Sequence, residues 1–122
     1  MNWAVGWLAL LLVGLGVGSV VYALSRRRDA PLTAKHVDDL PTRLDGQKLY
    51  VISEGAYLMQ ASMVCPDGCG ATINLNLMPD DQPCWTLRIG RGGRPTLHPS
   101  VWRLDGCGAH FFLRDGRVMW CD

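Results

Sequence analysis

Residues 105–120, DGCGAHFFLRDGRVMW, contain the two features that decide the fold. Asp115 and Gly116 separate two runs in which apolar and polar residues alternate, and this pair favours a two-residue type I′ turn. The segment therefore predicts a β-hairpin in which Arg114 faces Arg117. In the same register His110 would face Cys121, with Cβ atoms about 5 Å apart on one side of the sheet. The string DGCGA at 105–109 also occurs at 67–71, so the chain uses the same cysteine turn twice.

Alternation with a period of two continues through the rest of residues 47–122. Apolar residues recur at every second position in 57–63, 73–77 and 85–89, and clusters of Gly, Pro or Asp separate these runs. Such patterns are typical of half-buried strands. The sequence predicts a mainly β fold: a small antiparallel, zinc-ribbon-like domain of six or seven strands. A core this small favours stabilisation by a bound metal.

The N-terminal segment differs from the rest of the chain. Residues 3–24, WAVGWLALLLVGLGVGSVVYAL, carry no charge and are followed by Arg26, Arg27 and Arg28. At about 1.5 Å per residue this run can cross a hydrocarbon core of roughly 30 Å. We expect residues 1–25 to form a transmembrane anchor, and the arginines to keep the C-terminal domain on the cytoplasmic side of the inner membrane. A cleaved signal peptide is the alternative.

Two smaller features accompany this predicted anchor. Gly14 and Gly18 form a G-x-x-x-G pattern, which would allow two such helices to pack closely in a homodimer; glycines are also simply common in membrane helices, and that interpretation is the favoured one. Residues 26–46 are polar, contain two prolines and show no apolar period. They predict a linker with a short helix near Thr33–Leu40.

The five cysteines favour metal or redox chemistry, because a cytoplasmic domain meets a reducing pool. Two pairs of potential ligands have the spacing Cys65-x3-Cys69 and Cys107-x2-His110. Zinc takes four such ligands tetrahedrally, usually as close pairs from separate turns. We therefore predict a zinc site made by Cys65, Cys69, Cys107 and His110. The alternatives are two ordinary turns with free cysteines, or a site in which Cys121 is the fourth ligand.

Other chemistry has weaker support in the sequence. The net charge of +1 argues against nucleic-acid binding. Arg88, Arg91 and Arg94 lie in a glycine-rich stretch that lacks both common phosphate-binding arrangements. No Ser/His/Asp set and no pair of carboxylates stands out. The sequence therefore predicts no catalytic residue, and a protein that is more a binding module than an enzyme.

The strings CPDGCG, CWTL, TLHPSVW and CGAHFFLRDGRVMW together resemble the DUF6527 family of small bacterial and phage domains. The resemblance covers about residues 49–120 and implies a Cys/His metal site of unknown function. It implies metal ligands at Cys65, Cys69, Cys107 and His110, with Asp67 standing where the family often has a further cysteine. It also implies a structural role for Trp85, Pro99, Ser100, Trp102 and Trp120. Some members lie beside bacterial ubiquitin-like conjugation genes, which points to interaction with a protein.

Three functional hypotheses follow from these residues. The first is a membrane-tethered structural zinc domain that acts as an adaptor for an unknown protein partner, because four protein ligands leave no open position on the metal. The second is a redox protein with a Rieske-like or other iron–sulfur centre, although Rieske sites need two histidines. The third is a zinc-dependent hydrolase in which Asp67 or Asp105 acts as general base.

Overall fold

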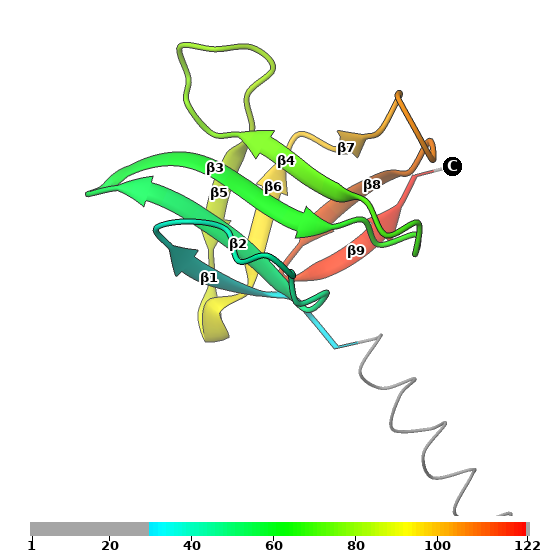
Figure 1. Ribbon diagram of the computed structural model, residues 1–122, viewed down its shortest axis with the longest axis horizontal. Coiled ribbons are helices and arrows are strands. Elements are labelled where there is room, and N and C mark those ends of the chain that lie inside the picture. The colour runs from blue at the N-terminus through cyan, green and yellow to red at the C-terminus, as the bar shows by residue number, and fades with distance from the viewer. Residues whose placement is uncertain (1–29, 122) are drawn as a thin grey trace, which may run out of the picture. The chain divides into compact units, whose positions relative to one another are not determined.

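The computed structural model describes residues 30–121, which form nine strands and one turn of 3-10 helix (Figure 1). The elements in chain order are β1 (Thr33–Val37), β2 (Lys48–Glu54), β3 (Tyr57–Val64), β4 (Thr72–Asn76), β5 (Thr86–Ile89), the 3-10 turn (Arg91–Gly93), β6 (Pro95–His98), β7 (Val101–Trp102), β8 (His110–Arg114) and β9 (Arg117–Trp120). They make three sheets with the orders β1-β2-β3-β4, β5-β6 and β7-β8-β9. The predicted mainly β fold is confirmed in this part of the chain.

The core lies where the four-stranded sheet faces the two smaller sheets (Figure 1). Alternate residues of β4 point into it, so Ile73 and Leu75 are buried while their neighbours are not. The smaller sheets contribute Leu97 from β6 and Phe111 from β8, both almost fully buried. Strands β4, β6 and β8 thus each bury one face, as the period of two predicts.

The first strand departs from the prediction. Thr33–Val37 was expected to be helical within a polar linker, but it forms β1 and pairs in parallel with β2, with Thr33 opposite Lys48. It is an edge strand with no fully buried residue. Because an edge strand needs no continuous apolar face, its polar sequence gave no period to detect.

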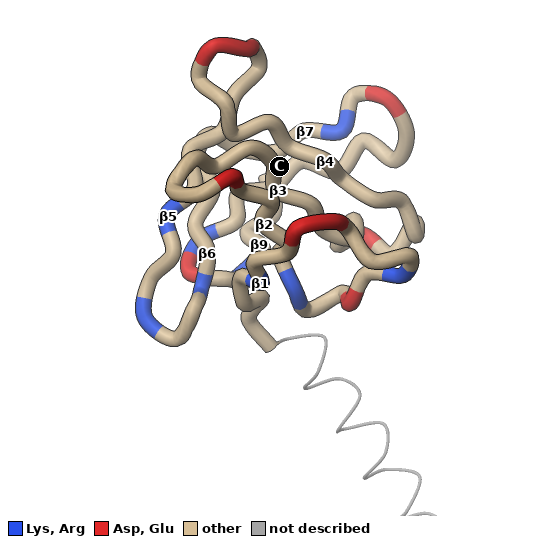
Figure 2. Tube along the Cα trace, turned by 60° about the vertical axis from the view of Figure 1, so that its left-hand side comes forward, with Lys and Arg blue, Asp and Glu red and all other residues tan. Residues whose placement is uncertain are grey.

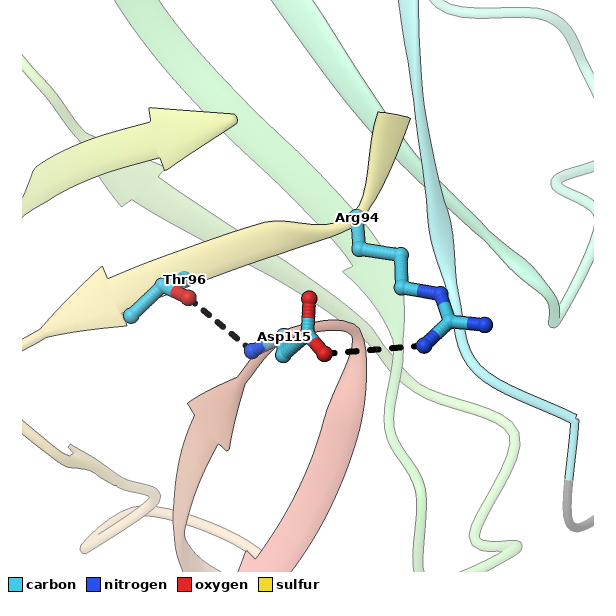
Figure 3. Close-up of polar contacts among 3 residues, drawn as sticks. All are labelled: Arg94, Thr96 and Asp115. Carbon is cyan, nitrogen blue, oxygen red and sulfur yellow. Dashed lines mark hydrogen bonds and ion pairs between the residues drawn. The ribbon is translucent and has the colours of Figure 1, made fainter. Parts of the chain in front are cut away.

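The predicted hairpin at the C-terminal end is confirmed. Arg114 pairs with Arg117, and Asp115 and Gly116 both have positive φ, at 50° and 76°, as a type I′ turn requires. The turn is fixed from outside by Thr96 Oγ1, which accepts the N–H of Asp115 at 2.9 Å, and by Arg94, whose guanidinium lies 3.5 Å from the Asp115 carboxylate (Figure 3).

The same turn also contacts the residues that lead into β1. The Leu32 N–H donates to the carbonyl of Gly116 at 2.7 Å, and the Gly116 N–H donates to the carbonyl of Pro95 at 2.8 Å. A Cβ on Gly116 would collide with the carbonyl oxygen of Leu32. Backbone hydrogen bonds therefore hold the hairpin turn against the start of β6 and against the residues that lead into β1.

No helix in residues 30–121 is long and apolar enough to cross a membrane. The predicted transmembrane helix, with its Gly14/Gly18 pattern, falls on residues 3–24, outside the described part of the chain. For residues 30–121 this corrects the predicted fold of a β domain preceded by a transmembrane helix to a mainly β fold. The predicted location as a single-pass protein of the inner (cytoplasmic) membrane is corrected to the same extent, because the described residues give it no support.

Charged residues of both signs are interspersed along the described chain (Figure 2). The loop between β4 and β5 carries Asp80 and Asp81, whereas Arg88 lies on β5, and Arg91 and Arg94 lie in the connection from β5 to β6. No single basic face covers the sheets in this view.

Candidate functional site

The first cysteine turn follows β3 directly. Cys65 is only 2% exposed, and its N–H donates to the carbonyl of Ala71 at 2.8 Å, which closes the turn. Inside the turn, Asp67 Oδ1 accepts the Cys69 N–H at 2.8 Å and lies 3.1 Å from Cys65 Sγ. Gly68 has φ at 87°, a conformation that side chains with a Cβ rarely adopt. The turn thus directs two thiols and one carboxylate to the same side.

The second cysteine turn joins β7 to β8. The Arg103 N–H donates to the carbonyl of Ala109 at 2.8 Å, so residues 103–109 form a closed loop with Cys107 near its tip. Gly106 and Gly108, on either side of this cysteine, have φ at 120° and 73°. The repeated DGCGA string therefore encodes the same kind of turn at two places, with glycine supplying the left-handed backbone.

The two turns meet at their sulfur atoms. Cys65 Sγ and Cys107 Sγ are 3.6 Å apart, and the ligand atoms of Cys65, Asp67, Cys69 and Cys107 all lie within 4.8 Å of one another. Two thiolates bound tetrahedrally at about 2.3 Å from zinc are separated by roughly 3.8 Å. The four side chains, which we call the cysteine cluster, can hold a metal ion.

Effects of opposite sign act on the charge of the cysteine cluster. Burial raises the pKa of the Cys65 thiol to about 12, because a thiolate would lose its hydration there. Interactions with the Cys107 thiol and the Cys69 N–H lower the pKa of Asp67. Arg103 Nη1 lies 3.3 Å from both Cys69 Sγ and Cys107 Sγ. A positive group already faces sulfur atoms that carry negative charge when they bind a metal.

The remaining predicted site residues lie elsewhere. His110, predicted as the fourth ligand, is outside the cysteine cluster and begins β8. Cys121 faces His110 as the register predicted, with its N–H donating to the His110 carbonyl at 2.9 Å, but its thiol is not in the cluster. Cys84, which was not among the predicted ligands, lies before β5, and its thiol is 3.6 Å from the carbonyl of Trp85.

His110 instead contacts a serine. Its Nε2 is 3.0 Å from Ser100 Oγ, a hydrogen-bond distance. The imidazole is stacked on the indole of Trp102, with ring centroids 4.7 Å apart and planes 11° from parallel. Trp102 and His110 are direct partners in the ladder between β7 and β8. The strand pairing thus sets the position of the histidine ring.

Ser100 lies immediately before β7 and is held through its backbone. The indole N–H of Trp85 donates to the Ser100 carbonyl at 3.2 Å. The side chain of Ser100 remains directed at His110 and is half-buried. A serine hydroxyl hydrogen-bonded to an imidazole is the arrangement that activates serine as a nucleophile.

Sequence reasoning missed this pair, since it predicted no catalytic residue and gave Ser100 only a structural role. The two residues are ten positions apart and match no short catalytic motif. One signal was present: if residues 103–109, which contain the second DGCGA string, had been interpreted as the connection of a hairpin, Trp102 would have been placed opposite His110. Ser100, two residues before Trp102, then falls on the same face.

Comparison with known families gives a match over most of the described chain. The family model described as "Bacterial ubiquitination-like system serine protease (BubE)" matches residues 36–121. The chain belongs to the BubE family. The match runs from β1 to Cys121 and includes both the cysteine cluster and the Ser100–His110 pair. No curated protein and no solved structure matches the chain.

This match corrects the resemblance to DUF6527, because the family model that fits is BubE. The strings that carried the resemblance all lie within the matched range. In this BubE member the loop 103–109 joins the two parts of the site: it carries Cys107 and Arg103, and it ends at the strand that begins with His110.

Proposed function

We propose that this chain is a serine protease that acts within a bacterial ubiquitination-like system, with Ser100 as nucleophile and His110 as general base. The observation that carries this proposal is the 3.0 Å distance between Ser100 Oγ and His110 Nε2. The description of the BubE family, which names a serine protease, supports the same chemistry. The substrate on this proposal is a polypeptide of that system.

The reaction follows the sequence that a serine and a histidine can carry out together. Ser100 Oγ attacks the carbonyl carbon of the scissile bond, and its proton passes to His110 Nε2. The tetrahedral intermediate breaks its C–N bond, and the leaving amine takes that proton from His110. Water then attacks the acyl-serine ester, gives its proton to His110, and releases the carboxylic acid as the serine recovers its hydrogen.

The histidine is oriented mainly by packing and strand pairing. Within residues 30–121 no carboxylate makes a hydrogen bond with His110. Its ring instead lies against Trp102, and its backbone is held on both sides, by β7 and by Cys121. We therefore describe the catalytic unit as a dyad, with Trp102 as a positioning residue.

We further propose that the cysteine cluster is a structural zinc site. Three thiols and one carboxylate provide four ligands, which fill a tetrahedral shell and leave no open position for water. On this proposal Asp67 takes the ligand position predicted for His110, because His110 is engaged with Ser100. Bound zinc would tie the loop 103–109 to the end of β3 and so stabilise the strands that carry the dyad.

The two roles can be separated by one set of assays on the full chain. The protein is incubated with a synthetic peptide mixture, and new termini are identified by mass spectrometry. Ser100→Ala should abolish cleavage, whereas Ser53→Ala, a change to a half-buried serine of β2, should leave it intact. Cleavage that survives in Ser100→Ala but disappears when a chelator removes metal from folded protein would contradict the proposal and favour a zinc hydrolase.

A further inference from the structure

The sheet β7-β8-β9 has one buried and one exposed face. Val101 and Phe111 are opposite one another in the ladder, and both are buried in the core. Along each strand, the residues that alternate with the buried ones have side chains on the opposite, exposed face. They are Trp102 on β7, His110, Phe112 and Arg114 on β8, and Met119 and Arg117 on β9. We call these six residues the exposed sheet face.

The exposed sheet face is apolar near the dyad. Trp102 is 57% exposed and Met119 is 48% exposed, although both are large hydrophobic residues. Phe112 lies between them in the ladder, paired with Met119 and two residues after His110. Contiguous exposed apolar residues on a protein surface are typical of interaction sites, whereas single ones are common everywhere.

The far end of the exposed sheet face is basic. Arg114 and Arg117 are direct partners beside the turn, and both are exposed. The Arg114 guanidinium lies 4.5 Å above the centre of the Phe112 ring. Within residues 30–121 neither arginine makes an ion pair, since the Asp115 carboxylate between them is the partner of Arg94. Two positive groups are thus available to a ligand that runs along the face.

The order of the histidine, apolar and basic residues along the face indicates the order of residues in a peptide that would bind it. His110, Phe112 and Arg114 follow one another along β8, so the distance from the dyad to the arginines is about four residues of extended chain, or roughly 14 Å. We propose that the exposed sheet face holds an extended segment of the polypeptide substrate, apolar next to the scissile bond and acidic about four residues away. This inference rests on the proposed protease function and adds the class of substrate sequence to it.

The peptide-mixture assay on the full chain tests this inference directly. In the unaltered protein, Asp and Glu should be enriched about four residues from the cleaved bond, and apolar residues beside it. Replacing both arginines by glutamate turns attraction of acidic substrate residues into repulsion. Because exposed ion pairs contribute up to about 1 kcal/mol each, the preference for acidic over basic residues at that distance should change by about 10-fold. The variant with both Arg114→Glu and Arg117→Glu should therefore favour Lys and Arg at that distance. Arg88→Glu, on exposed β5, is the matched control and should leave the preference unchanged.

Labelling of Ser100 by a fluorophosphonate separates the failure of this inference from failure of the proposed function. If Ser100 is labelled but the preference is the same in the double variant, or no peptide is cleaved, the exposed sheet face does not hold the substrate and the dyad still stands. If Ser100 is not labelled, both proposals are overturned. The molar mass in solution, measured by light scattering, adds one further outcome. If the unaltered protein is a dimer and the Met119→Lys variant is a monomer, the exposed sheet face binds a second copy of the chain and the inference is overturned.

Discussion

The cysteine cluster and the Ser100–His110 dyad are joined by loop 103–109, which contributes Cys107 to the cluster and ends at His110, yet they are built in different ways. The cluster is built from turns, because glycines at positive φ in both cysteine turns direct the thiols inward. Three of its four side chains are exposed, those of Cys69, Cys107 and Asp67. The dyad is built from strands, because Trp102 and His110 are partners in the ladder between β7 and β8. The backbone of Ser100 is held by the hydrogen bond from the Trp85 indole to its carbonyl. Loop 103–109 connects the two.

This difference implies that the two regions fail in different ways. The cluster gathers three thiols and a carboxylate, and the mutual repulsion of these groups, once ionised, would be offset by a bound metal ion together with Arg103, so loss of the metal should reduce stability. The dyad rests on a sheet whose hydrogen bonds do not involve the reacting atoms, so its loss should remove activity and leave the fold intact. Each prediction below tests one side of this contrast.

The largest expected effect is that of His110→Ala on catalysis. Without the base, kcat/KM for a cleaved peptide should fall by at least about 10³-fold. The free energy of unfolding should fall by only about 1 kcal/mol, because the half-buried ring contributes mainly its stacking on Trp102. Peptide kinetics and urea unfolding measure the two quantities. His98→Ala, at an exposed position that ends β6, is the control and should change neither.

The next effect is that of Cys65→Ser on metal content and stability. The buried thiol is the centre of the cluster, and its loss should remove the bound metal and lower the free energy of unfolding by about 3 kcal/mol or more. Mass spectrometry of metals and denaturant unfolding are the measurements. Cys84→Ser, outside the cluster, should keep the metal. Equal metal content in both variants would show that the cluster does not bind it.

A change at the hairpin turn tests how the dyad strand is held. In Gly116→Ala the new Cβ would collide with the backbone of Leu32 at a residue whose φ is 76°, so the free energy of unfolding should fall by about 2 kcal/mol. Gly55→Ala has a similar φ of 60° and open space around the Cβ, and should cost about 1 kcal/mol or less. Equal losses in thermal unfolding would mean that the contact with Leu32 adds nothing.

The smallest effect is expected at Arg103. Its guanidinium faces Cys69 and Cys107, so Arg103→Ala should weaken metal affinity by about 10-fold without removing a ligand. Competition with a coloured chelator measures the affinity. Arg91→Ala, in the exposed 3-10 turn, is the control. An unchanged affinity in Arg103→Ala would show that the arginine does not offset the charge of the thiolates.

The contrast between the two regions also explains what the sequence could predict. The cysteine turns, the strands of the core and the Asp115–Gly116 hairpin are local patterns, and the structure contains each of them. Ser100 and His110 become neighbours only through the ladder between β7 and β8, and β7 has two residues, too few to show a period. Asp67 was not predicted as a ligand, because its position in an Asp-Gly turn also fits a turn-forming role. Strand β1 is polar and at an edge, so it resembled a linker.

The central claim is that His110 activates Ser100, and a single labelling experiment tests it most directly. The full chain is treated with a fluorophosphonate, digested, and the modified residue is located by tandem mass spectrometry, with His110→Ala treated in parallel. We predict an adduct on Ser100 in the unaltered protein and a labelling rate at least about 10²-fold lower in His110→Ala. An adduct on another serine, or equal labelling of Ser100 in both proteins, would contradict the claim.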